Sequence, residues 1–165
     1  MLVLFLLLLG FFARVIAHVP NFTPVIALIL FGGVYLDKKY ALLLPIFLMV
    51  VTDIILGIHS MMLFTWGSLI LVSVLGLKLR KNKNWLGIAG TSLVSAVVFF
   101  IVTNFGFWLA GYYPPTFEGL TTCYMMAIPF LRSTLASTLV YSVALFGVYE
   151  IIAARVKNTR LAFVL

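Results

Sequence analysis

The chain has 165 residues, of which 64% are hydrophobic and 9% are charged, and its mean hydropathy is +1.23. A soluble domain is about half apolar and about a quarter charged, so this composition excludes a soluble enzyme, a disordered tail and a nucleic-acid-binding module. A bilayer span needs about 20 residues, which leaves room for roughly six or seven spans and no soluble domain. We therefore expect an all-α, polytopic membrane protein with a single transmembrane domain over residues 1–165.

The predicted elements follow the apolar runs in chain order. The first run contains Arg14 and lacks a basic n-region, so we expect a span there, with a signal peptide ending at the small-residue pattern Val15-Ile16-Ala17 as the alternative. The later runs stop at prolines, polar turns and basic clusters. The expected spans are residues 2–17, 24–36, 41–56, 61–77, 85–110 and 133–154. Residues 120–130 are apolar but too short to span, which predicts a short re-entrant or interfacial helix.

The net charge of +7 has a simple source in the loops. Residues 37–40, 78–84 and 155–165 hold nine of the eleven Lys and Arg residues. Cytoplasmic loops collect Lys and Arg during insertion, so this asymmetry predicts six spans with the N-terminus and the C-terminus both cytoplasmic, as in a multi-pass inner-membrane protein. The loops expected on the outer side contain no Lys or Arg: residues 18–23, 57–60 and 111–131.

The unusual polar side chains lie in the outer loops and at the outer ends of the spans. This placement predicts a substrate-binding site that opens to the outside, above a mostly apolar bundle. Together with two aromatic residues, the candidate binding set is Arg14, His18, Asn21, Asp53, His59, Asn104, Trp108, Tyr112, Glu118, Cys123 and Arg132.

Asp53 is the acidic residue placed deepest in a predicted span. A charge near the bilayer centre costs roughly 2.5–3.5 kcal/mol on insertion scales, so it needs a partner or a cavity. Arg14 and Arg132 are the candidate partners. Two interpretations stay open: a structural ion pair that locks the bundle, or a contact to a ligand.

The histidines, the cysteine and the aromatic residues each have a structural and a functional interpretation. His18 and His59 are either turn residues or ligands, and Cys123 is either a small buried hydrophobe or a ligand. One thiol and two imidazoles suit a soft or borderline metal centre, but sequence spacing does not show that they converge. Trp108 and Tyr112 fit an interfacial aromatic belt, with stacking on a planar ligand as the alternative.

Several catalytic patterns are absent from the sequence. It contains neither G-x-x-x-x-G-K-[ST] nor H-E-x-x-H, which are the patterns of a phosphate-binding loop and of one class of zinc protease. We expect no enzyme, no resident cofactor and no metal of the protein's own, while an integral membrane enzyme remains the third and weakest hypothesis.

Two groups of motifs carry a resemblance to a known family. The stretches 21–35 (NFTPVIALILFGGVY), 38–42 (KKYAL) and 53–57 (DIILG) are similar to the second and third spans of substrate-binding S components of energy-coupling-factor vitamin transporters. The stretches HVPNFTP, TNFG and YPP, which begin at His18, Thr103 and Tyr113, look like a related group of small bacterial membrane proteins.

The resemblance implies a function and a partner. An S component binds one water-soluble vitamin from outside and works with a transmembrane coupling protein and ATPase subunits. Solitary relatives transport cobalamin, with a cysteine as cobalt ligand, so a corrinoid is the best single expectation for the ligand, with Cys123 and His18 as candidate cobalt ligands. The alternative is a non-catalytic structural subunit of a larger membrane complex, which would have no cavity.

Overall fold

The computed structural model describes residues 1–16, 21–57, 60–157, 159 and 162. Every regular element in this part of the chain is helical. The helices are α1 (Leu2–Ile16), α2 (Val25–Tyr35), α3 (Lys38–Leu56), α4 (Met62–Leu79), the short 3-10 helix η1 (Arg80–Asn82), α5 (Trp85–Leu109) and α6 (Phe117–Val156). The predictions for the first five spans are confirmed as helices, with bounds that differ by at most three residues.

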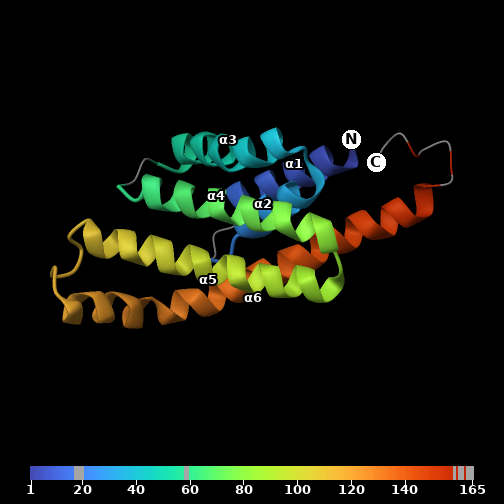
Figure 1. The fold of residues 1–165 in the computed structure, drawn as a ribbon. Helices are drawn as coiled ribbons and strands as arrows, with labels where there is room; N and C mark the ends of the chain where they lie inside the picture. The colour runs from blue at the N-terminus through green and yellow to red at the C-terminus, as the bar shows by residue number, and fades with distance from the viewer. Residues whose placement is uncertain (17–20, 58–59, 158, 160–161, 163–165) are drawn as a thin grey trace.

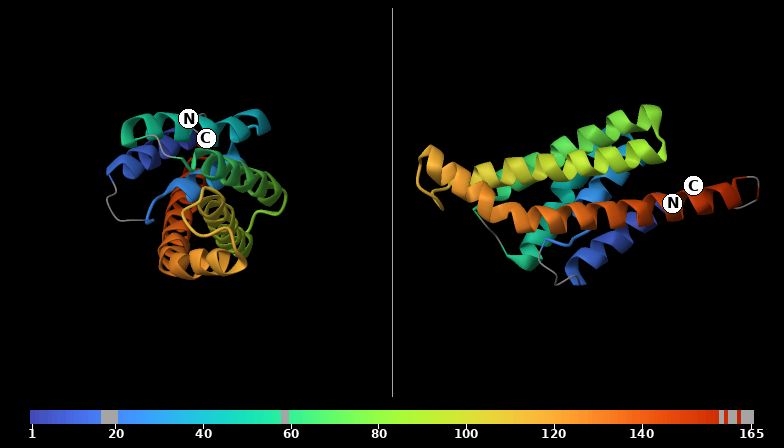
Figure 2. Two further views of the ribbon diagram at one scale, coloured as in Figure 1. Left: turned by 90° about the vertical axis from the view of Figure 1, so that its left-hand side faces the viewer. Right: turned by 90° about the horizontal axis from the view of Figure 1, so that it is seen from below.

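The prediction for the last part of the chain is wrong in one respect. Residues 120–130 and 133–154 do not form two helices, because α6 runs as one helix of 40 residues through Pro129. Proline removes one backbone donor and bends a helix without necessarily ending it. Figure 2 shows that the first part of α6 and the rest of the helix run in different directions. The connection between α5 and α6 is therefore short, with Thr116 as the N-cap that accepts a hydrogen bond from the Gly119 amide at 3.1 Å.

Helix α2 is the centre of the molecule. All residues from Val25 to Val34 are buried, and α2 contacts α1, α3, α4, α5 and α6. A helix that is apolar on every side belongs in the interior. Eleven residues span only about 16 Å at about 1.5 Å per residue. Helices α4, α5 and α6 form the outer row next to it, with α4 between α3 and α5 (Figure 1).

Three helices in the described part of the chain are long and apolar enough to cross a bilayer. They are α4 extended through η1 (Met62–Asn82), α5 and α6. Many large apolar side chains on the outside of the bundle are exposed, such as Phe5, Phe47 and Leu86 at 59%, 67% and 83%. Such a surface fits hydrocarbon rather than water, so the chain is a membrane protein.

The two ends of the bundle differ in chemistry. The start of α3, the turn between α4 and α5 and the end of α6 lie at one end, together with the start of α1 (Figure 1). We call this the basic end; its cationic residues are Lys38, Lys39, Lys78, Arg80, Lys81, Lys83, Arg155 and Lys157. The connections from α3 to α4 and from α5 to α6 lie at the opposite end, which we call the aromatic end after Trp108, Tyr112 and Tyr113.

Candidate functional site

A cavity of about 190 Å³ lies among the helices, and all six α-helices contribute to its lining. Its apolar wall comes from α2, α3, α4 and α5, through Val25, Ile26, Met49, Leu69 and Phe99. Its polar groups come from α1, α4, α6 and the segment before α2, through Arg14, Asn21, Thr23, Thr65, Thr134 and Ser137. This mixture of an apolar wall and a few polar groups is typical of small-molecule sites.

Three of the four hydroxyl-bearing side chains that line the cavity already use their protons. Thr65 donates to the carbonyl of Met61 at 3.0 Å, and Thr134 donates to the carbonyl of Phe130 at 2.9 Å. Ser137 donates to the carbonyl of Thr134 at 3.0 Å. A hydroxyl has one proton and two lone pairs, so these three groups are left as hydrogen-bond acceptors.

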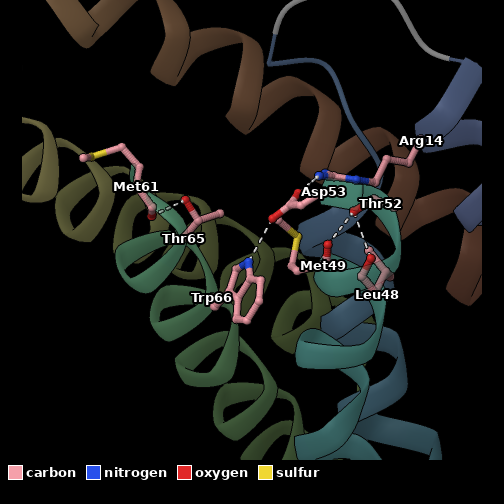
Figure 3. Close-up of polar contacts among 8 residues, drawn as sticks. All are labelled: Arg14, Leu48, Met49, Thr52, Asp53, Met61, Thr65 and Trp66. Carbon is pink, nitrogen blue, oxygen red and sulfur yellow. Dashed lines mark hydrogen bonds and ion pairs between the residues drawn. The ribbon is translucent and has the colours of Figure 1, made fainter. Parts of the chain in front are cut away.

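A buried ion pair stands beside the cavity. The Arg14 guanidinium lies 3.6 Å from Asp53 Oδ1, and Trp66 Nε1 donates a hydrogen bond of 2.9 Å to Asp53 Oδ2 (Figure 3). The side chains of Arg14 and Asp53 are 14% and 4% exposed. Asp53 lies near the end of α3, so its carboxylate joins α1, α3 and α4. Of the two candidate partners for Asp53, the structure selects Arg14, since the side chain of Arg132 is exposed.

Arg14 also retains one group for a further contact. Its Nε atom is buried and has no hydrogen-bond partner in the described part of the chain. A buried donor without a partner is destabilising, so a water or a ligand atom that accepts a hydrogen bond from this Nε–H would remove that cost. Asn21 stands at the same cavity with a φ of 58°, a left-handed conformation that asparagine tolerates.

A second group of predicted residues lies at the aromatic end. Trp108 Nε1 donates to the carbonyl of Pro114 at 2.9 Å, and the hydroxyls of Tyr112 and Ser60 lie 3.0 Å apart. These contacts shape a hollow of about 440 Å³ on the surface, which is lined by Trp108, Leu109, Gly111, Tyr112, Tyr113, Pro114 and Pro115. This hollow shares no lining residue with the central cavity.

Asn104 and Cys123 tie α5 to α6. The thiol of Cys123 is buried and lies 3.4 Å from the carbonyl of Asn104, while the side-chain amide of Asn104 donates to the carbonyl of Phe100 at 2.8 Å. Neither residue lines the cavity or the hollow. Both side chains have the contacts expected of packing residues.

The remaining predicted residues do not join these groups. Glu118 lies in the exposed first turn of α6, and Arg132 is exposed on the same helix. His18 and His59 lie outside the described residues, so their role as ligands stays a prediction. Among the residues that the structure describes, no group of three His, Cys, Asp or Glu side chains is placed to hold a metal ion.

Sequence reasoning missed a cluster at the basic end, where the cationic residues were interpreted only as a topology signal. The Tyr35 hydroxyl donates to the Glu150 carboxylate at 2.5 Å, and Lys83 contacts both residues and lies 4.7 Å from the centre of the Tyr35 ring. Arg80 donates to the carbonyls of Gly33 and Leu36 at the end of α2. The cluster fastens α2, α6 and the α4–α5 turn together.

The cavity residues from α4, α5 and α6 were missed as well. Thr65, Phe99, Thr134 and Ser137 look like ordinary span residues. The same holds for Trp66, which does not line the cavity but donates a hydrogen bond to Asp53 beside it. One signal was present: α6 has hydroxyl residues at spacings of three and four, which places them on one helix face. They are Thr134, Ser137, Thr138 and Ser142, and all four are buried.

The chain belongs to a protein family of unknown function, DUF6580, whose sequence pattern matches residues 1–160. No curated protein and no solved structure matches the chain.

Proposed function

We propose that this protein is a membrane-embedded solute-binding protein that captures a small water-soluble compound of the vitamin class for uptake. The observation that carries the proposal is the cavity of about 190 Å³ to which all six α-helices contribute. A subunit with a purely structural role gains nothing from such a cavity, because an empty space among packed helices loses van der Waals contacts. A solute that contacts all six α-helices can also favour one arrangement of these helices over another.

The proposal includes an orientation in the membrane. All six α-helices are taken to lie in the bacterial inner membrane, with the basic end in the cytoplasm and the aromatic end outside. The supporting observation is the gathering of cationic residues at one end of the bundle, as the positive-inside rule requires. Trp108, Tyr112 and Tyr113 then lie at the outer interface, where aromatic belts form.

The volume of the cavity limits the size of the ligand that can bind in it. Pockets for drug-sized molecules have volumes of about 300–1,000 Å³, so a cavity of about 190 Å³ accepts a smaller compound. A corrinoid is far too large to be enclosed there, and the thiol of Cys123 faces the backbone of α5 rather than the cavity. The proposal therefore commits to a vitamin or precursor of single-ring size, while corrinoids belong in the test panel.

Uptake also requires a partner or an autonomous movement of the protein. The resemblance to S components points to a transmembrane coupling protein with ATPase subunits. The outward face of α1 supports such a contact, since Leu4, Phe5, Leu8, Leu9 and Phe12 are each at least 55% exposed. The same face also suits contact with lipid, so we propose the coupling protein separately from the solute-binding function.

The test is thermal unfolding of the purified protein in detergent, with single-ring vitamins, corrinoids and a low-molecular-weight metabolite extract. A ligand present at a hundred times its dissociation constant stabilises the folded state by about 2.7 kcal/mol. We expect at least one small compound to raise the melting temperature. Stabilisation by a corrinoid alone would contradict binding inside the cavity, and no shift with any sample would favour the structural subunit.

A matched pair of variants locates the binding. Thr134→Phe fills the cavity from α6 and should abolish the ligand-induced shift, whereas Thr122→Phe adds the same ring at an exposed position of that helix and should preserve it. Equal shifts in both variants would place the ligand elsewhere.

A further inference from the structure

We infer that the cavity selects an uncharged, single-ring compound that carries one hydrogen-bond acceptor beside at least one N–H or O–H donor. Amides and lactams on a flat ring have this chemistry. The inference rests on the proposed function and specifies the ligand class of the same cavity. Three observations carry it: the charge balance, the distribution of donors and acceptors, and the apolar wall.

The charge balance excludes an anionic ligand. Arg14 is the only charged side chain among the described residues that line the cavity. Its positive charge is already matched by the Asp53 carboxylate at 3.6 Å, in surroundings where both side chains are largely buried. A bound carboxylate or phosphate would therefore add an unmatched negative charge in a region of low dielectric constant. A neutral acceptor contacts Arg14 without this penalty.

Four of the polar side chains that line the cavity have a defined hydrogen-bonding role toward a ligand. Arg14 supplies a buried Nε–H without a partner in the described part of the chain, which calls for an acceptor on the ligand. Thr65, Thr134 and Ser137 have given their protons to backbone carbonyls and offer lone pairs only. These oxygens call for N–H or O–H groups on the ligand, which a carboxylate lacks.

The rest of the wall favours a flat apolar body. Phe99, Met49 and Leu69 from three different helices line the cavity together with Val25 and Ile26 from α2. An aromatic ring and a thioether pack well against a planar ring. With a volume of about 190 Å³, the cavity accommodates one such ring with a small polar substituent.

The experiment compares probes that have nearly the same shape but differ in charge: nicotinamide against nicotinate, and benzamide against benzoate. Binding to the purified full chain is measured by calorimetry and by thermal shift at pH 7. We expect each amide to bind at least tenfold more tightly than its carboxylate. Tighter binding of the carboxylates would overturn the inference and leave the proposed function intact.

The Asp53→Asn variant tests most directly whether the ion pair sets the preference for uncharged ligands. The variant removes the negative charge while its amide oxygen still accepts from Trp66 Nε1, so the charge of Arg14 becomes unmatched. We expect the preference to reverse, with the carboxylate of each pair bound more tightly than the amide. An unchanged preference for the amides would show that the ion pair does not set the selectivity.

Two further variants keep the test decisive if Asp53→Asn does not fold. Arg14→Lys preserves a cation for Asp53 but lacks the Nε–H, so amide binding should weaken about tenfold while the melting temperature of the free protein changes little. Thr134→Val keeps the shape of the side chain and removes the acceptor, which should weaken amide binding roughly three- to tenfold. Unchanged affinity in both variants would overturn the inference.

The outcomes separate the inference from the proposed function. If a compound from the metabolite extract binds in the cavity and is anionic, the inference fails and the function stands. If that compound is neutral, both are supported. If neither the four probes nor the extract binds, both fail.

Discussion

Two ion-paired clusters in the described part of the chain have similar composition and opposite surroundings. At the cavity, Arg14 and Asp53 are 14% and 4% exposed and receive support from Trp66. At the basic end, Lys83 and Glu150 are 32% and 39% exposed and receive support from Tyr35. Each cluster joins three segments of the chain with one carboxylate, one cation and one aromatic donor.

The difference in burial assigns the two clusters different roles. Breaking a buried pair leaves a charge without compensation, whereas an exposed pair contributes about 0.2–1 kcal/mol and is screened by salt. The cavity cluster is therefore a feature on which folding depends and which leaves one donor available for a ligand. The basic-end cluster fastens helix ends and has little influence on total stability.

The largest expected effect comes from Arg14→Ala. It removes the cation beside the buried Asp53 and should lower the free energy of unfolding by about 3–5 kcal/mol. Chemical denaturation in detergent measures the loss. Arg132→Ala is the matched control at an exposed position and should change stability by less than about 0.5 kcal/mol. Similar losses in both variants would contradict the special role of the buried pair.

Trp66→Phe tests the buried cluster through the hydrogen bond that Trp66 donates to Asp53. The ring is retained and the Nε1 donor is lost, so the expected destabilisation is about 1.5–3 kcal/mol, the range for bonds to a charged group. Trp108→Phe loses a bond to the exposed carbonyl of Pro114 and should have a smaller effect, within about 1 kcal/mol. Thermal unfolding of the two variants in parallel measures the difference.

Gly33→Ala tests how closely α2 and α4 approach each other. A Cβ atom on Gly33 would lie 2.8 Å from the carbonyl oxygen of Ser73 and 2.9 Å from the Cα of Gly76, so the backbones must move apart. We expect a loss of about 1–3 kcal/mol in denaturation experiments. Gly90→Ala meets nothing within 4 Å on α5 and should be neutral or stabilising. A neutral Gly33→Ala would contradict the close packing of α2.

The smallest effect is expected at the basic end. Lys83→Ala removes the contacts to Glu150 and Tyr35 and should cost at most about 1 kcal/mol, because the pair is partly exposed. The loss should shrink further when the salt concentration is raised. Unfolding curves at low and high salt provide the measurement, and a large salt-independent loss would show that this cluster matters as much as the one at the cavity.

The amino-acid sequence was sufficient for the features that depend on neighbouring residues. The apolar runs predicted the helices of the first five spans, and the Lys and Arg pattern placed the cationic residues at one end of the bundle. Asp53 was correctly identified as a residue that needs a partner, because burial of a charge is costly in any fold. Pro129 was misleading, since a proline that bends a helix and a proline that ends one look alike in sequence.

Only the tertiary structure decided which helix faces meet. It paired Asp53 with Arg14 rather than Arg132, separated Asn104, Trp108 and Cys123 from the cavity, and brought Thr65, Phe99 and Ser137 together from three helices. Helical periodicity gives the face of a residue on its own helix, but the partner of that face depends on the packing of segments far apart in the chain. The composition and pattern of the sequence therefore determined a helical membrane protein with one basic end, and the packing of its helices around α2 determined where that protein has a site.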